Sequence, residues 1–152
     1  MRYTPPKRTP GPRARANNAA HKRDWLAILQ RQRFACAGCG ARSVPLQDAH
    51  LAGRPGSGAC LGAWANAPEL RVALCRADPA RGTLGCHEKI DRDLDPELRD
   101  RLRWEAVQRL DDCIQPDLGD SAGDPAADPL DAIRALVRLA EERHIPPPGD
   151  QM

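Results

Sequence analysis

The segment from residue 86 to residue 92, "CHEKIDR", concentrates side chains that bind metal ions. Cys86 is followed at once by His87, and Asp91 comes four residues after that histidine. Thiolates, imidazoles and carboxylates are the ligands that hold zinc in structural and catalytic sites. The segment therefore predicts metal chemistry, and the remaining ligands of any such site have to come from elsewhere in the chain.

The cysteines supply one complete set of ligands. Cys36 and Cys39 form a Cys-x-x-Cys pair, "CAGC", which places two thiolates on one turn and so provides half of a tetrahedral zinc shell. Cys75 and Cys86 are the expected other half: one ends the apolar run "LRVALC" and the other opens a predicted helix. Ten loop-like residues separate them, and the entropic cost of closing a loop grows only slowly with its length.

The roles of the other two cysteines, and a redox alternative to zinc binding, also have to be considered. Cys60 lies in a glycine-rich loop and could replace one ligand, whereas Cys113 is expected to be a small buried side chain on a helix. A redox role for Cys36 and Cys39 is the main alternative to structural zinc, but no β-α-β pattern surrounds this pair.

The sequence also predicts the compartment. It begins without an apolar signal segment and has no apolar run long enough to span a bilayer. We therefore expect a cytoplasmic protein with no membrane association. In a reducing compartment, clustered cysteines favour metal binding over disulfides.

Composition and charge predict a small domain with a polyanionic partner. The chain has 152 residues, of which 41% are hydrophobic and only 3% aromatic, so the core is small and a structural metal would supplement it. Through Arg33 there are nine lysines and arginines against one acid, whereas from Asp111 onward ten acids face three arginines. The basic half favours nucleic acid, with a solvated tail as the alternative.

The expected elements flank a compact central block. Residues 1–16, rich in Pro, Arg and Gly, are interpreted as a disordered basic arm. A helix is predicted from about residue 17 to Arg33, where Gly and Pro are absent and apolar residues fall at helical spacing. Short strands are predicted within "VPLQDAHLAG" and "LRVAL", and a helix from about Cys86.

Two further helices are predicted by an aspartate followed by proline, a pair that caps a helix and begins its first turn. One starts at Asp95 and reaches about Ile114; the other starts at Asp128 and reaches about Arg143. Residues 115–127 are read as an acidic linker between a domain at 17–114 and a C-terminal helix with its tail at 128–152. The predicted fold class is α+β and mostly helical.

The turn formed by "CAGC" at 36–39, here called the knuckle, is followed by a strand, a glycine-rich loop, a second strand and a helix. This order resembles the HNH endonucleases, whose core is the ββα-metal finger. The motifs that carry the resemblance are "CAGC", "DAH" at 48–50, "NAPELRVALC" at 66–75 and "CHEKIDR" at 86–92. They look most like the small phage and prophage nucleases of the YbcO type. The resemblance covers about residues 34–92 and implies a zinc-braced finger flanked by one N-terminal and two C-terminal helices.

The resemblance implies a metal-dependent DNA endonuclease of phage or prophage origin. Cys86 would belong to the structural zinc site. His87 and Asp91, on one helical face, would hold a catalytic Mg²⁺ or Mn²⁺ ion that balances charge on the scissile phosphate. His50, at the end of the first strand, would be the general base that takes a proton from water.

Two positions depart from the family pattern, and they keep another function open. Ala49 stands where the family has an acid or a second histidine, with Asp48 one residue further back, and Leu70 stands where it has asparagine. A catalytically inactive, zinc-stabilised nucleic-acid-binding module is the alternative. A redox or metal-handling protein is a third hypothesis.

Contacts to DNA are expected from basic residues of the N-terminal half. Phosphate contacts by such residues give affinity that falls with salt and carries little sequence information. His21 and His144 are expected to be ordinary surface residues, and a homodimer is compatible with the sequence. The predicted DNA contacts are Arg13, Arg15, Lys22, Arg23 and Arg54.

Overall fold

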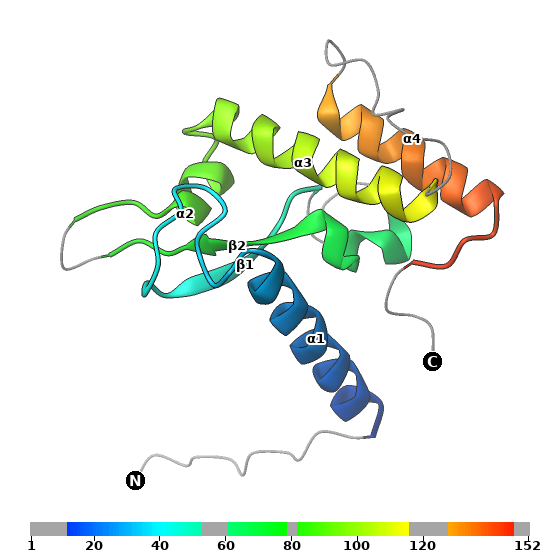
Figure 1. The fold of residues 1–152 in the computed structure, drawn as a ribbon, viewed down its shortest axis with the longest axis horizontal. Helices are drawn as coiled ribbons and strands as arrows, with labels where there is room; N and C mark the ends of the chain where they lie inside the picture. Colours follow the sequence, from blue (N-terminus) through cyan, green and yellow to red (C-terminus); the bar gives the residue numbers. More distant parts are fainter. Residues whose placement is uncertain (1–11, 53–60, 79–81, 116–127, 148–152) are drawn as a thin grey trace, which may run out of the picture.

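The structure is a computed structural model that describes residues 12–52, 61–78, 82–115 and 128–147 (Figure 1). It confirms a mixed α+β fold in which helices outweigh a small two-stranded sheet. The elements in chain order are α1 (Pro12–Arg31), β1 (Leu46–His50), the 3-10 turns Gly62–Asn66 and Pro68–Leu70, β2 (Arg71–Cys75), α2 (Cys86–Asp91), α3 (Pro96–Ile114) and α4 (Pro129–Glu142).

The two strands pair antiparallel, with Leu46 opposite Cys75 and His50 opposite Arg71. Successive side chains of a strand point to opposite faces. One face of the pair therefore carries Ala49 and Val72, and the other carries His50 and Arg71. Both faces are covered, because four of the five residues of β2 are buried.

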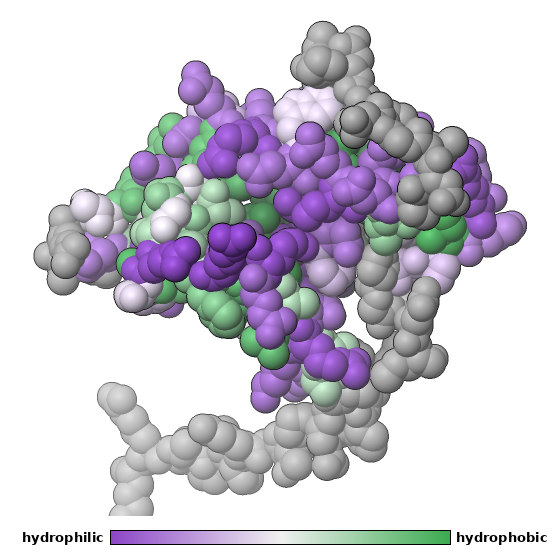
Figure 2. Space-filling view, viewed as in Figure 1, coloured by the Kyte–Doolittle hydropathy of each residue, from purple (hydrophilic) through white to green (hydrophobic). Residues whose placement is uncertain are grey.

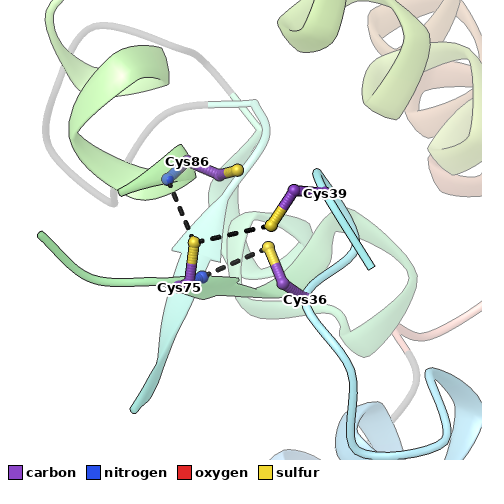
Figure 3. Close-up of side chains that lie close together, drawn as sticks. All are labelled: Cys36, Cys39, Cys75 and Cys86. Carbon is purple, nitrogen blue, oxygen red and sulfur yellow. Dashed lines mark hydrogen bonds between the residues drawn. The ribbon is translucent and has the colours of Figure 1, made fainter. Parts of the chain in front are cut away.

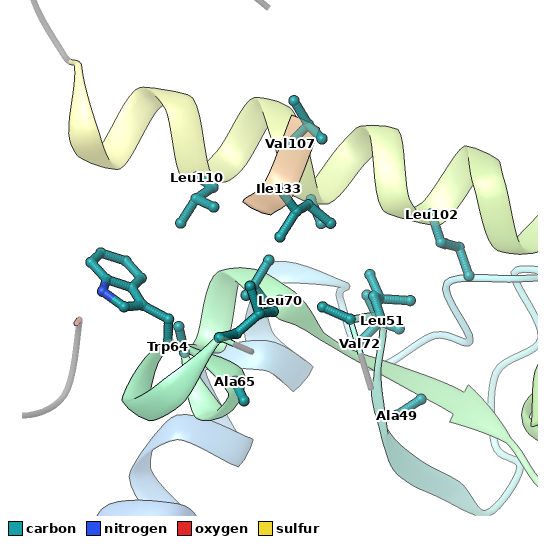
Figure 4. Packing of buried hydrophobic residues seen from close by; sticks show 14 of the residues in the cluster. Ala49, Leu51, Trp64, Ala65, Leu70, Val72, Leu102, Val107, Leu110 and Ile133 are labelled. Carbon is teal, nitrogen blue, oxygen red and sulfur yellow. The ribbon is translucent and has the colours of Figure 1, made fainter. Parts of the chain in front are cut away.

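The apolar face of the strand pair packs against α3, with α4 on the outer side of α3 (Figures 1 and 4). Leu102, Ala106 and Leu110 of α3 are fully buried, as the predicted apolar face requires. Ile133 and Val137 of α4 join the same cluster. The last helix therefore belongs to the common core, and its apolar stripe is used for packing within the chain.

Helix α1 lies on the other face of the strand pair (Figure 1). The Gln32 side chain, just beyond α1, accepts a hydrogen bond from the main-chain N–H of Ala73 at 2.9 Å. The helix begins at Pro12, inside the segment predicted to be a disordered arm. Proline fits the first turn of a helix because the N–H it lacks would have no partner there, so Pro12 marks a start and not a break.

Both predicted helix caps are present. The Asp95 carboxylate accepts from the N–H of Leu98 at 3.0 Å, and Asp128 accepts from the N–H of Leu130 at 2.7 Å. The prediction that Cys113 is buried is wrong: the residue lies on the exposed side of α3. None of the described helices combines the length and apolar character needed to cross a membrane.

Candidate functional site

Four cysteines meet at one point beside the strand pair (Figure 3). The sulfur atoms of Cys36, Cys39, Cys75 and Cys86 all lie within 4.8 Å of one another, and those of Cys39 and Cys75 are 3.8 Å apart. A tetrahedral zinc ion with Zn–S bonds of about 2.3 Å would separate its sulfur ligands by about 3.8 Å. The predicted set of four thiols is confirmed as a group that could hold a metal ion such as zinc.

Local backbone geometry assembles this cysteine cluster. The N–H of Gly40 donates to the carbonyl of Cys36 at 2.8 Å, and Gly40 has a φ of +73°, which closes the turn between the first two cysteines. Gly38 is required for space, because a Cβ there would lie 2.7 Å from the sulfur of Cys86. The knuckle therefore packs directly on α2.

Main-chain donors prepare the thiols for a cation. The N–H of Cys75 donates to the sulfur of Cys36, and the N–H of Cys86 donates to the sulfur of Cys75, each at 3.3 Å (Figure 3). Burial alone would raise the pKa of Cys36, but main-chain N–H groups, those of Cys39 and Cys75 foremost, lower this pKa to about 7. Burial, with a further contribution from the Cys36 thiolate, raises the pKa of Cys86. A bound dication would offset the repulsion between neighbouring thiolates, so that the thiols would ionise together.

His50, the predicted general base, is held by the loop between the strands. Its Nδ1 lies 3.1 Å from the carbonyl oxygen of Ala65, in the first 3-10 turn. A carbonyl only accepts, so Nδ1 carries a hydrogen in this contact. In the neutral ring Nε2 then carries the lone pair. This is the tautomer that a base acting through Nε2 needs.

His87 and Asp91 lie side by side on α2, as their spacing predicts. Nδ1 of His87 is 3.1 Å from a carboxylate oxygen of Asp91, and Nε2 is 3.3 Å from the main-chain carbonyl of Asp48. The His87 ring, only 7% exposed, therefore approaches β1 two residues before His50. Two residues along a strand correspond to about 7 Å.

The structure assembles the two predicted metal sites to different degrees. Within the described ranges, the four cysteines are the one group of three or more metal-binding side chains close enough to share an ion. Both ring nitrogens of His87 contact protein oxygens, so a metal ion would have to displace Asp91 from Nδ1 or share it. The shared Mg²⁺ or Mn²⁺ site of His87 and Asp91 stays a prediction.

A buried ion pair beside His50 was missed from the sequence. Arg71, 2% exposed, donates from Nε to both carboxylate oxygens of Asp48 at 3.1 Å and lies 3.6 Å from Asp24 of α1. His21 is exposed, as expected of a surface residue, but its Nε2 lies 3.3 Å from Asp48. Strand alternation places Asp48, His50 and Arg71 on one face, and this alternation was the signal that could have linked them.

The predicted DNA contacts are only partly described. Lys22 and Arg23 are exposed on α1. Arg13 and Arg15 lie in the first turns of the same helix. Arg54, together with Cys60 as a substitute ligand, falls outside the described residues, so both stay predictions.

Comparisons with protein-family models, with curated proteins and with solved structures gave no match. The function therefore has to be inferred from the geometry of these two clusters.

Proposed function

We propose that this protein is a metal-dependent endonuclease that hydrolyses phosphodiester bonds in DNA. The carrying observation is the arrangement of His50, whose Nδ1 is fixed by a loop carbonyl at the end of β1. The cysteine cluster joins the knuckle, the end of β2 and the start of α2, and so keeps His87 next to β1. The resemblance to HNH endonucleases adds the order of the same motifs.

In the proposed reaction His50 acts as the general base. The Ala65 carbonyl orients the ring and stabilises the hydrogen on Nδ1, so the Nε2 lone pair takes a proton from the attacking water. The imidazolium formed in this step keeps its hydrogen bond to that carbonyl. Orientation by a fixed acceptor is a common way to select one tautomer of a catalytic histidine.

His87 and Asp91 would hold the divalent ion. When bound, Mg²⁺ or Mn²⁺ supplies positive charge to the scissile phosphate and its leaving oxygen. The chain's contribution is a nitrogen of the buried His87 ring and a carboxylate oxygen of Asp91, which is 58% exposed and within reach of solvent. The preference of these ions for oxygen ligands makes Asp91 the stronger ligand of the pair.

The test is the nicking of supercoiled plasmid by zinc-loaded protein, with Mg²⁺ or Mn²⁺ added or omitted. His50→Asn should lower the nicking rate by about 10²- to 10⁴-fold, the usual contribution of a general base. The matched control is His144→Asn, since His144 is an exposed histidine just beyond α4. Full activity in His50→Asn would refute the proposal.

A zinc-stabilised DNA-binding module without catalysis is the second candidate. The observation that favours it is His87, whose two nitrogens both face protein oxygens and leave no lone pair directed at an ion. Plasmid binding that persists with no nicking in the presence of Mg²⁺, Mn²⁺ or Zn²⁺ would decide for this candidate.

A further inference from the structure

A groove of ≈ 540 Å³ opens next to the knuckle, and its lining includes none of the four cysteines and neither His50 nor His87. The last turns of α1, the chain that leaves the knuckle and the start of β1 form its walls. Figure 2 shows hydrophobic residues gathered over the strand pair and its neighbouring loops, between the hydrophilic surfaces of α1 and α3. The residues that matter for the argument are Trp25, Leu29, Arg33, Phe34, Arg42 and Val44.

The lining combines aromatic surface with positive charge. Phe34 is 55% exposed, although it is the chain's one phenylalanine and aromatic residues are scarce. Trp25, Arg33 and Arg42 line the same groove, and no carboxylate is among the described residues that line it. An apolar floor with cationic walls is complementary to flat bases joined by phosphates.

The backbone holds these side chains in conformations that cost stability. Arg33, Phe34 and Ser43 have φ values of 52°, 56° and 58°. Arg33 donates to the Gln30 carbonyl, and Phe34 donates to the Leu29 carbonyl. This is the pattern that ends a helix with a left-handed residue, usually glycine. A residue with a side chain costs about 1–2 kcal/mol there. The sequence therefore keeps an arginine and a phenylalanine at positions where glycine would be more stable.

The groove and His50 lie on the same side of the strand pair. Leu46, at the groove, and His50 are four residues apart on β1 and so point to one face, about 13 Å from each other. Helix α1 follows that face, with His21 beside Asp48 and Leu29 at the groove. One extended polyanion could therefore reach both places.

We propose that the groove binds unpaired bases of single-stranded DNA, with Phe34 and Trp25 as stacking surfaces and Arg33 and Arg42 as phosphate contacts. The inference rests on the proposed function for its choice of DNA as the ligand. It adds that the substrate has a single-stranded segment next to the scissile phosphate. Bases within an intact duplex are stacked on one another and leave no face free for Phe34.

The test measures binding of a fluorescein-labelled oligothymidine of about 20 nucleotides to full-length, zinc-loaded protein without Mg²⁺ or Mn²⁺. Base–aromatic stacking is worth about 1–3 kcal/mol per base, so Phe34→Ala should weaken binding by about 5- to 150-fold. Arg42→Ala should weaken it in a salt-dependent way. Duplex of the same length should bind the wild type and Phe34→Ala alike.

Matched controls lie outside the groove. Leu94 is an exposed apolar residue, and Arg138 is an exposed arginine on α4, so Leu94→Ala and Arg138→Ala should leave the affinity unchanged. Oligothymidine should also quench tryptophan emission in the wild type but not in Trp25→Leu, because Trp64 is buried in the core and Trp104, on α3, does not line the groove. This second readout holds even if Phe34→Ala binds less zinc.

Three outcomes would overturn the inference. Affinity unchanged in Phe34→Ala and Arg42→Ala excludes the groove as the binding site, and equal weakening in the controls does the same. A lower sedimentation mass in Phe34→Ala would assign the groove to a contact between copies of the chain. If oligothymidine binding needs Phe34 but no plasmid is nicked, the groove is a binding site and the protein is not a nuclease. If plasmid is nicked but oligothymidine binding does not need Phe34, the protein is a nuclease and the groove is not its binding site.

Discussion

The cysteine cluster and the histidine site, which consists of His87 and Asp91, use neighbouring residues of α2 in opposite ways. Cys86 and His87 are adjacent, yet the sulfur of Cys86 meets three other sulfurs, whereas the His87 ring nitrogens meet a carboxylate and a main-chain carbonyl. Within the described part of the chain, the hydrogen-bond partners of the thiols are main-chain N–H groups and one another. A dication could bind all four thiols together. The polar groups of the histidine site, in contrast, already have hydrogen-bond partners within the protein.

This difference indicates that the two sites contribute differently to stability and to activity. An ion bound by the cysteines would hold the knuckle, β2 and α2 together, because these segments supply its ligands and would lose their positions if the ion were lost. An ion bound at a site whose polar groups already have protein partners adds less to stability. Its ligands can also be replaced more readily by solvent or substrate. We expect stability to depend on the first cluster and activity on the second.

The largest expected effect is on the cysteine cluster. Cys39→Ser should abolish stoichiometric zinc binding and lower the free energy of unfolding by more than about 4 kcal/mol, because metal binding supplies much of the folding free energy in small metal-braced units. Zinc analysis and thermal unfolding followed by circular dichroism measure both quantities. The control is Cys113→Ser, which changes an exposed thiol far from the cluster in sequence and should alter neither.

Retention of zinc and of the melting temperature in Cys39→Ser would contradict the division. Equal losses in the two serine variants would contradict it as well, since they would show that the thiol change itself, and not its place in the cluster, lowers stability.

The second prediction concerns the ion pair beside His50. Arg71→Leu should lower the free energy of unfolding by about 3 kcal/mol, because removal of one partner leaves a partly buried carboxylate uncompensated. Urea titration of the zinc-loaded protein measures the change. The control is Arg134→Leu, which breaks a pair with Asp131 on the surface of α4 and should cost less than about 1 kcal/mol.

If Arg71→Leu were as stable as the wild type, the ion pair would contribute no more than the hydrophobic side chain that replaces it. The end of the strand pair that carries His50 would then be held by α1 packing and by the cysteine cluster alone.

Local signals explain what the sequence could predict. Asp95 and Asp128, each followed by proline, locate two helices; the segment "VPLQDAHLAG" and the apolar run "LRVALC" locate the strands. Cys36 and Cys39 were found from their Cys-x-x-Cys spacing, and Cys75 and Cys86 because one ends a strand and the other begins a helix. Such signals lie within a few residues of the feature that they predict.

The missed features depend on residues far apart in the chain. The pairing of Arg71 with Asp48 spans 23 positions, and the groove joins α1 to the segment before β1. Cys113 was predicted as buried because a free cysteine usually behaves as a small hydrophobic side chain, but its side of the helix faces solvent. One-dimensional periodicity indicates that a helix has a buried face and does not fix which marginal position lies outside it.

The smallest expected effect on stability belongs to His50, which the proposed function makes the most important residue for activity. Among the described residues, its ring has one hydrogen-bond partner, the carbonyl of Ala65, and the residue is half-buried. Loss of a single hydrogen bond of this kind costs about 1 kcal/mol, so His50→Asn should lower the free energy of unfolding by no more than that while nicking falls by orders of magnitude. Urea titration and the plasmid assay on one preparation measure both effects. A stability loss equal to that of Arg71→Leu would instead place His50 in the packing that holds the strand pair, and its effect on nicking would then follow from unfolding and not from chemistry.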